Sequence, residues 1–458
     1  MSDFHSAHRR RLLALFGAGL AGPALWPSLA RADLRASDYR ALVCVLQEGG
    51  NDGENTLIRY DSPGYQQYAS VRPVASGINI PQSALLPIQP ASQTVPFGFH
   101  PACGALQKLF NQKKLAVIAN VGNLVRPATR SGLLAGTDPR PSQLFNHIDQ
   151  VRQAQTADAL DLLQTGWGGR MADRLNTLNT GSVFPALTSL GDTRIFVEGK
   201  TSIPLALPVH DFFSIFGINE DPQLSALRNA ALLQILNEVP SNLYEQAAQT
   251  LAKKSLQSTD VVNPIFSNRN SAVTQLYNGV NNPVSLQFRQ IARLIEARAT
   301  TGLKRQIFFV RQPQYDTHNN QLNDQHLLLD NLSSALKTFT DAMALLGLER
   351  NVTTFTISDF GRTFKPATGG GTDHGYGNYA FVLGGAVNGG DFYGRVATAA
   401  LGGPDDIGDD GRWIPTTSTE QYGATLARWL GLDSTSLEYA FPNLTSFTKP
   451  DLGFMSQD

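Results

Sequence analysis

The run VTTFTISDFGRTFKPATGGGTDHG, residues 352–375, decides the fold. It begins with β-branched and aromatic residues, which favour a strand, and its apolar part stops at Asp359. A glycine-rich loop then leads to Asp373 and His374. In an open α/β sheet, ligands bind in the crevice beyond the carboxyl ends of the strands. The run therefore predicts a strand whose carboxyl end presents acidic and imidazole groups for chemistry.

Two further stretches repeat this arrangement. The apolar residues 41–46 lead into the turn-rich loop EGGNDG, which carries Asp52. The apolar residues 307–310 lead into a loop that carries Asp316 and His318. Because three predicted strands end in such residues, we expect these groups to meet at one edge of a sheet. Carboxylates combined with imidazoles suit Zn²⁺, Mn²⁺ or Mg²⁺, and such a site supports ester hydrolysis.

Helices and strands alternate along much of the remaining chain. Residues 100–114 predict a helix and residues 115–121 a buried strand. Residues 325–346 predict a long helix that connects the second and third of the strands above, as a right-handed parallel crossover does. Residues from about 209 to 300 carry helical patterns and few candidate ligands, which predicts a helical insertion or cap. We therefore expect a three-layer α/β protein with a mainly parallel central sheet.

Two segments between these elements have a less regular pattern. Residues 142–156 predict a helix with Ser142 as its N-cap, and His147 on it faces either a cleft or the protein interior. Residues 183–208 predict two or three short strands, which form a peripheral or antiparallel piece.

The amino-terminal residues have the features of an export signal. Arg9, Arg10 and Arg11 precede the apolar residues 12–25, and residues 30–32 form an AxA-like cleavage site. The paired arginines are typical of twin-arginine export, so we expect residues 1–32 to be removed and residues 33–458 to form one periplasmic or secreted domain. An uncleaved anchor is the alternative, although the apolar stretch is short for a membrane span.

Charge and cysteine content exclude several other classes. The formal net charge of −1 gives no reason to expect a nucleic-acid partner, because proteins that bind phosphate backbones usually carry a basic face. Cys44 and Cys103 are too few for a zinc ribbon or a disulfide scaffold. Cys44 lies inside an apolar strand as a small core residue, and one disulfide between the two is the alternative.

Five short motifs, in order along the chain, carry a resemblance to a known family. They are GGNDG at 49–53, QLFNHIDQ at 143–150, YDTHNNQ at 315–321, SDFGRT at 358–363 and GTDHG at 371–375. Together they resemble the domain-of-unknown-function family 1501, whose members are secreted, commonly twin-arginine-exported bacterial proteins. That family is related to the alkaline phosphatase and sulfatase superfamily.

The resemblance implies an alkaline-phosphatase-like fold and a metal site with one or two divalent ions, Zn²⁺ or Mn²⁺. It implies five metal ligands, namely Asp52, Asp316, His318, Asp359 and His374. Asp316 and His318 form a reasonable chelating pair, because residues two apart in an extended loop point to the same side. Asp373 then orients His374 from behind.

The resemblance also implies residues that act on the substrate. We expect Asn146, His147 and Arg362 in this role, with Arg362 either neutralising an oxyanion or pairing with a nearby carboxylate. Relatives carry Ser at the position of Asn146, and the superfamily commonly has His at the position of Phe360. Because an amide is a poor nucleophile, either water attacks directly or the site serves only for binding.

These features predict an exported metal-dependent hydrolase of phosphate or sulfate esters, with a small molecule or glycan as the substrate. We expect no stable membrane insertion after signal cleavage, and we expect the twin-arginine export machinery as a partner. The alternative is a non-catalytic exported protein with a degenerate metal or anion site, which binds a ligand or acts in the cell envelope. A zinc peptidase is excluded in its commonest form because the sequence has no HExxH motif.

Overall fold

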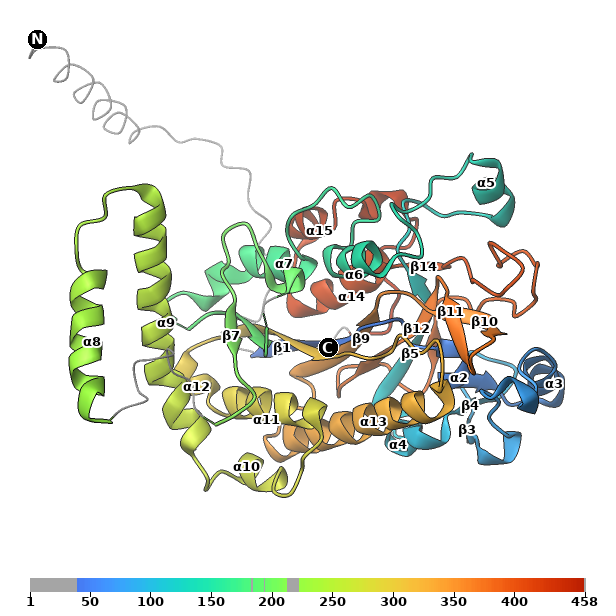
Figure 1. Cartoon of the computed structure of the whole chain (residues 1–458), viewed down its shortest axis with the longest axis horizontal. Helices are drawn as coiled ribbons and strands as arrows, with labels where there is room; N and C mark the ends of the chain where they lie inside the picture. Colours follow the sequence, from blue (N-terminus) through green and yellow to red (C-terminus); the bar gives the residue numbers. More distant parts are fainter. Residues whose placement is uncertain (1–38, 183, 193, 212–221, 457–458) are drawn as a thin grey trace, which may run out of the picture. The chain divides into compact units, whose positions relative to one another are not determined.

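A mixed sheet of nine strands forms the centre of the computed structural model, which describes residues 39–182, 184–192, 194–211 and 222–456 (Figure 1). In sheet order the strands are β13 (Phe392–Tyr393), β5 (Leu115–Gly122), β12 (Asn378–Leu383), β9 (Val352–Ser358), β1 (Arg40–Gln47), β8 (Arg305–Gln312), β6 (Leu187–Leu190) and β7 (Leu205–Leu207), and β14 (Thr417–Ser418) pairs with β5. β12 is antiparallel to both its neighbours, whereas the other pairings are parallel. The predicted mainly parallel sheet is confirmed.

The register of the three central strands places their carboxyl ends level with one another. Gln47 at the end of β1 pairs with Gln312 of β8 on one side and with Ser358 of β9 on the other. β12 runs in the opposite direction, so its first residue, Asn378, pairs with Val121 near the carboxyl end of β5. The segments that follow β1, β8 and β9 and the segment that precedes β12 therefore meet at one edge of the sheet.

Helices cover both faces of this sheet (Figure 1). Alternate residues of β1 point to opposite faces, because successive side chains of a strand do so. Val43 and Val45 pack in the cluster that includes α4 (Gly104–Asn111), α11 (Pro283–Glu296) and α13 (Gln321–Leu345). Leu42 and Leu46 pack in the cluster that includes α7 (Trp167–Leu175), α14 (Thr419–Leu430) and α15 (Ser434–Ala440). The predicted three-layer α/β class is confirmed.

The remaining elements lie between or beside these layers. The other helices are α2 (Gly53–Thr56), α3 (Ser62–Val71), α5 (Arg130–Ala135), α6 (His147–Thr156), α8 (Pro222–Leu236), α9 (Leu243–Ser267), α10 (Ala272–Leu276) and α12 (Arg298–Thr301). A small sheet joins β2 (Leu57–Arg59), β4 (Phe97–Phe99) and β3 (Leu86–Ile88), and β10 (Arg362–Ala367) pairs with β11 (Gly371–His374) as a hairpin.

The structure changes the interpretation of residues 183–208 and 209–300. β6 and β7 are peripheral, as one alternative predicted, but they extend the main sheet in parallel because β6 pairs with β8. α11 is not part of an insertion, since its Phe288 and Ile291 are buried in the main core. The helical pattern of α11 in the sequence does not distinguish this helix from α8 and α9. These two form the helical hairpin at the left of Figure 1.

The two cysteines are free and buried. Cys44 packs in the cluster around α14, whereas Cys103 packs in the cluster around α13, so the sheet separates them. The alternative of one disulfide is therefore wrong. Within the described part of the chain, no helix has the length and apolar character needed to cross a membrane. The predicted signal, residues 1–32, lies outside the described residues.

Candidate metal centre

Four predicted site residues converge beyond the level strand ends. Asp316 and His318 lie in the loop after β8, His374 ends β11, and His147 begins α6. Each offers one ligand atom, and these four atoms all lie within 4.8 Å of one another. Four segments that are far apart in the sequence thus place one carboxylate and three imidazoles in one small volume.

The spacing of the ligand atoms fits a single small cation. Nε2 of His374 lies 3.0 Å from Nε2 of His147 and 3.1 Å from Nε2 of His318. Oδ1 of Asp316 lies 3.1 Å, 2.9 Å and 3.5 Å from Nε2 of His147, His318 and His374 respectively. In a tetrahedral zinc site with metal–nitrogen bonds of about 2.0–2.1 Å, neighbouring ligand atoms lie about 3.3 Å apart.

The outer nitrogens of the imidazoles are held by hydrogen bonds. Nδ1 of His147 lies 2.9 Å from Oδ2 of Asp359, and Nδ1 of His374 lies 2.7 Å from the carbonyl oxygen of Phe145. A carbonyl oxygen only accepts, so Nδ1 of His374 carries the proton, and its Nε2 presents a lone pair in the neutral ring. The same holds for His147 against an ionised Asp359. Two lone pairs 3.0 Å apart repel each other unless a cation or proton lies between them.

The surrounding charges favour such a cation. Burial lowers the pKa of His147, but the carboxylates of Asp359 and Asp316 outweigh this effect, so the pKa is raised overall. The pKa of His374 is lowered, since burial and the nearby His147 and Arg362 disfavour a positive charge on its ring. A positive charge is thus favoured on the His147 ring, next to the two carboxylates, and disfavoured on the His374 ring.

Asp359 supports this group from outside. Its side chain is buried, Oδ2 lies against His147, and Oδ1 accepts a hydrogen bond of 3.1 Å from the Gly49 amide. Burial raises the pKa of Asp359, and the hydrogen bond from His147 opposes that shift. We expected Asp359 as a ligand, but both of its oxygens are engaged, so the structure gives it an orienting position.

Arg362 lies against a ligand rather than in open space. Its Nη1 donates to Oδ1 of Asp316 at 2.9 Å and to the Gly49 carbonyl at 3.3 Å, while Nη2 donates to the Thr372 carbonyl at 2.6 Å. Burial raises the pKa of Asp316, but the hydrogen bond and charge of Arg362 outweigh burial and lower it. Of the two predicted roles, the structure favours pairing with a carboxylate over contact with a substrate oxyanion.

Asn146 is a helix cap. Its Oδ1 accepts a hydrogen bond of 2.9 Å from the Ile148 amide, so α6 begins at His147 and not at Ser142 as predicted. An N-cap side chain satisfies an amide that has no partner within the helix. This cap fixes where α6 starts and therefore where His147 points. The cap occupies the side-chain oxygen of Asn146 but not its amide NH2 group, so the expected contact with substrate stays a prediction.

The sequence profile of the family described as "Protein of unknown function (DUF1501)" matches residues 39–444. The chain belongs to the DUF1501 family. The family resemblance stated above is thereby confirmed. No curated protein matches this DUF1501 chain.

Several solved structures are distantly similar to this DUF1501 protein. The PsFucS1 sulfatase from Pseudoalteromonas sp. is 11% identical, with 92% of this chain and 74% of that chain covered and a TM-score of 0.34. The periplasmic domain of EcEptC from Escherichia coli, in complex with Zn, is 10% identical, with 76% and 74% covered and a TM-score of 0.32. A protein in the alkaline phosphatase superfamily from Vibrio parahaemolyticus is 12% identical, with 87% and 67% covered and a TM-score of 0.34. With likeness this low, function has to be argued from this chain's own geometry.

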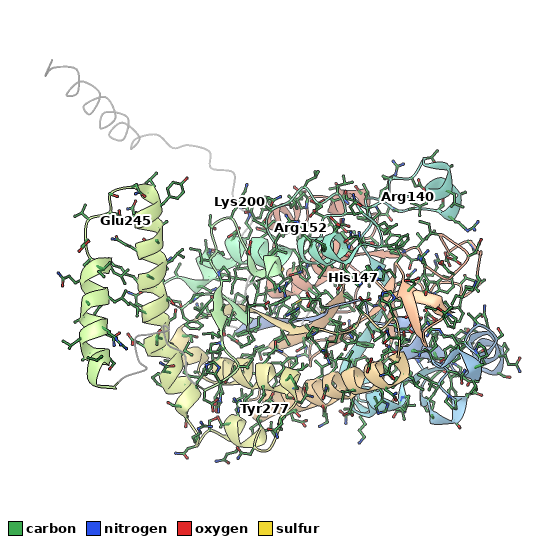
Figure 2. The ribbon with its side chains drawn as sticks, viewed as in Figure 1. Arg140, His147, Arg152, Lys200, Glu245 and Tyr277 are labelled. Carbon is green, nitrogen blue, oxygen red and sulfur yellow. The ribbon has the colours of Figure 1, made fainter. Side chains whose placement is uncertain are left out.

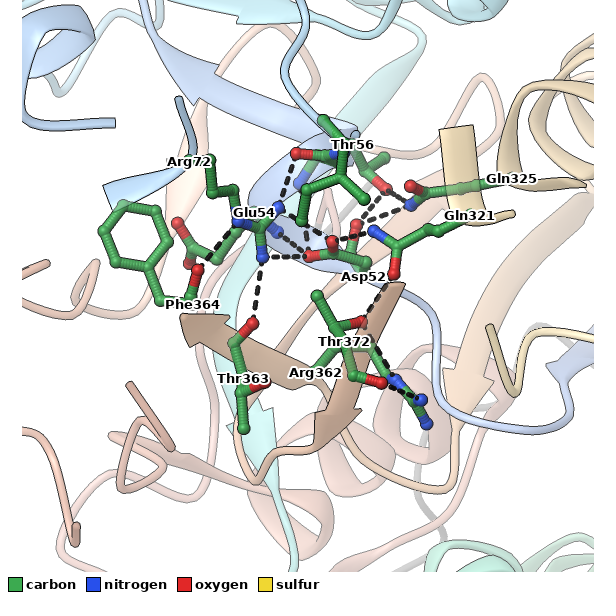
Figure 3. Close-up of polar contacts among 12 residues, drawn as sticks. Asp52, Glu54, Thr56, Arg72, Gln321, Gln325, Arg362, Thr363, Phe364 and Thr372 are labelled. Carbon is green, nitrogen blue, oxygen red and sulfur yellow. Dashed lines mark hydrogen bonds and ion pairs between the residues drawn. The ribbon is translucent and has the colours of Figure 1, made fainter. Parts of the chain in front are cut away.

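Asp52 of this DUF1501 protein lies in a buried ion pair outside the four-ligand group (Figure 3). Its oxygens accept from Nη1 and Nη2 of Arg72 at 2.8 Å and 3.1 Å, and from the amide of Gln321 at 2.5 Å. It also caps α2 through the amides of residues 54 and 55. We expected Asp52 as a metal ligand. The structure instead neutralises its charge with Arg72.

The buried pair is still connected to the metal-ligand group (Figure 3). Gln321 donates to Asp52 and accepts from the hydroxyl of Thr372 at 2.5 Å. That hydroxyl in turn accepts from Nε of Arg362 at 3.3 Å, and Arg362 holds Asp316. Asp52 therefore acts on the ligand loop at a distance, by fixing the residues that position Arg362.

Two glycines allow the ligand-bearing loops to approach. Gly49 has a φ of +111°, and a Cβ there would lie 2.5 Å from the amide nitrogen of Asp316. A Cβ at Gly371 would lie 2.2 Å from the carbonyl carbon of His318. Backbone contact this close is possible only without a side chain. The glycines of two sequence motifs thus allow the loop that carries Asp316 and His318 to pack closely against its neighbours.

Sequence reasoning missed two features of the site. His147 was expected to act on the substrate, and the structure places it among the four residues that could hold a metal ion. The carbonyl of Phe145, which orients His374, was not considered, because a backbone contact leaves no trace in residue type. Phe145 lies only two residues before His147, so the segment that supplies His147 also supplies the carbonyl that orients His374. This proximity in sequence was the available signal.

Replacing Arg72 with Met is expected to lower the free energy of unfolding by about 3–5 kcal/mol, because it leaves the buried Asp52 carboxylate unpaired. Arg59 with Asp61 is the matched control, since both pairs have a nitrogen–oxygen distance of 2.8 Å but Arg59 is 39% exposed. Arg59→Met is expected to cost about 0–1 kcal/mol. Urea denaturation measures both. Equal losses in the two variants would contradict the argument.

Replacing Gly371 with Ala is expected to weaken Zn²⁺ binding roughly 10–100-fold, because the added methyl displaces the loop that carries His318. Competition with a chromophoric chelator measures the affinity, and circular dichroism checks the fold. Gly104→Ala is the control, because a Cβ there meets nothing nearer than 4.0 Å. Unchanged zinc affinity in a folded Gly371→Ala protein would show that this contact does not position the ligand.

Proposed function

We propose that this protein is an exported metal-dependent hydrolase of phosphate or sulfate esters. The observation that carries the proposal is the convergence of one carboxylate and three imidazole nitrogens within 4.8 Å. The proposed ligands are His147, Asp316, His318 and His374. A set of three imidazoles and one carboxylate suits Zn²⁺, with Mn²⁺ as the second choice. When bound, such an ion acts as a Lewis acid on an ester oxygen and activates water.

The ligand group is open to a substrate. The side chains of Asp316 and His318 are 45% and 41% exposed. A cavity of about 710 Å³ adjoins the group, whereas another of about 770 Å³ lies elsewhere in the protein and does not reach it. His147, Asp316 and Asp359 line the adjoining cavity. An ester that lies in this cavity can therefore reach the ligand group.

Water is the proposed nucleophile. Within the described part of the chain, the residues that line the adjoining cavity include no Ser, Thr or Cys. Asn146, at the position where relatives carry Ser, is engaged as a helix cap. Arg362 holds Asp316, while Asp359 and the Phe145 carbonyl hold two imidazoles. The chain's own residues thus orient the ligands and leave the attack on the ester to water.

A second candidate is a non-catalytic exported protein that uses the same site for binding. The observation that favours it is the complete set of four protein ligands, since catalytic zinc sites usually have three and keep one position open. The absence of a hydroxyl nucleophile among the described residues lining the cavity points the same way. The two candidates differ in turnover but not in metal content.

The purified protein without residues 1–32 is expected to bind close to one Zn²⁺ or Mn²⁺ per chain and to hydrolyse an aryl phosphate, a phosphodiester or an aryl sulfate. Chelation is expected to abolish hydrolysis. His374→Ala is expected to lose the ion and to lower kcat/KM by at least about 100-fold, because His147 and His318 then lack the ligand between them. Elemental analysis and release of the aryl group measure these effects.

His326→Ala is the matched control for that experiment, because His326 is exposed and contacts the His100 ring outside the ligand group. It is expected to keep both ion and activity. Turnover that survives chelation and His374→Ala would overturn the metal-dependent mechanism. A bound ion with no turnover of any of the three substrates would favour the binding protein instead.

Export through the twin-arginine route is part of the proposal. Replacing Arg9, Arg10 and Arg11 together with Lys preserves the charge but removes the paired arginines that the export machinery recognises. The variant is expected to remain in the cytoplasm, while the wild type appears in the periplasm or medium. Fractionation with antibody detection measures this. Unchanged export of the lysine variant would point to the general secretory route.

A further inference from the structure

The cavity beside the ligand group contains a cluster of arginines. Arg152 belongs to α6, Arg194 precedes the short helix Ile195–Val197, and Arg311 lies in β8, and all three line the cavity of about 710 Å³. Arg152 lies one and a half turns after His147 on the same helix, and Figure 2 labels both. The cavity thus extends from the ligand group to a surface formed by three guanidinium groups.

These guanidinium groups are partly open to solvent, and each is paired with at least one carboxylate. Their side chains are 30%, 30% and 32% exposed for Arg152, Arg194 and Arg311. Glu48 serves two of them, with Oε1 3.7 Å from Nη2 of Arg194 and Oε2 against Nε of Arg311. Asp192 also lies near both arginines, so two carboxylates face these two guanidinium groups, while Arg152 pairs with Asp161.

Some of the hydrogen-bonding capacity of these arginines is unused. Each guanidinium has five N–H donors. Nε of Arg194 is buried and has no hydrogen-bond partner among the described residues. Asp192 contacts Nη2 of Arg194 at 3.0 Å but lies 3.9 Å from Nη1 of Arg311. A buried donor without a partner costs free energy, which an incoming acceptor removes.

We propose that Arg194 and Arg311, with Arg152 beside them, bind a second oxyanion of the substrate while its ester lies at the ligand group. This inference rests on the proposed hydrolase function and names the substrate class: an ester that carries at least one further sulfate, phosphate or carboxylate. The planar guanidinium fork matches such oxyanions with paired hydrogen bonds. A cavity of about 710 Å³ falls within the range of about 300–1,000 Å³ that small-molecule ligands occupy.

Calorimetric titration tests this site directly, without turnover. The probes are a disaccharide with two sulfate groups, the same disaccharide with one, and a hexose bisphosphate with its monophosphate. We expect the member with two anionic groups, here called the doubly charged probe, to bind about ten-fold more tightly than the member with one, the singly charged probe, in at least one pair. The pair that shows the preference identifies the second group as sulfate or phosphate. Equal affinities within both pairs would overturn the proposal.

Substitutions of opposite sign sharpen the test. Arg311→Gln and Arg194→Gln are each expected to remove most of the preference for the doubly charged probe and to leave the singly charged probe unchanged. Glu48→Gln is expected to strengthen binding of the doubly charged probe, because it releases two arginines from a competing carboxylate. Arg126→Gln is the matched control, since Arg126 pairs with Asp138 outside the cavity.

The outcomes separate this site from the hydrolase function. A preference that persists in His374→Ala and disappears in Arg311→Gln supports the arginine site even when no hydrolysis is found. A preference that is unchanged in both Arg311→Gln and Arg194→Gln overturns it even when hydrolysis is found. Weaker binding of the doubly charged probe in Glu48→Gln also overturns it, because Glu48 then holds the arginines in place rather than competing for them.

Discussion

The hydrogen bonds on the outer nitrogens of His147 and His374 are the constraint on which the site depends. Each fixes which ring nitrogen carries the proton, so the inner nitrogens present lone pairs to one another and to Asp316. For His318 the corresponding group is the carboxylate of Asp373, 3.5 Å from Nδ1. An outer acceptor that orients the imidazole, as for His147 and His374, is typical of metal-ligating histidines.

The sheet makes this convergence possible, and most of the sheet could be predicted from the sequence. Strands buried on both faces read as continuous apolar runs, and such runs lead into the segments that carry Asp52, Asp316 and Asp359. The pairing of Gln47 with both Gln312 and Ser358 then places those ends level. The reversal of β12 could not be read from its apolar residues, yet it explains why His374 comes from a segment that precedes a strand rather than one that follows it.

The parts that could not be predicted depend on partners distant in sequence. Arg72 contacts Asp52 from α3 and its following turn, which no spacing rule indicates, and Asp359 after β9 is held by His147 of α6. The start of α6 depended on whether Ser142 or Asn146 capped it, and both residue types are good caps. α11 has an apolar face whether it covers an insertion or the sheet, so only the burial of Phe288 and Ile291 decides its place.

The number of ions follows from how three carboxylates at the same edge are balanced. Asp52 is fully buried against Arg72, and Asp359 is 1% exposed against His147, so each already has a positively charged or hydrogen-bonding partner. Asp316 also contacts Arg362, but its side chain is 45% exposed and its Oδ1 lies among three imidazole nitrogens. A second ion would have to displace Arg72 from the buried carboxylate of Asp52. Arg72 would then be an unpaired buried cation, at a cost of about 3–5 kcal/mol. The balance of charge therefore favours one ion over two at the proposed metal site. Under the proposed function, the arginines of the adjoining cavity, rather than a second metal, are then the groups that hold further negative charge on a substrate.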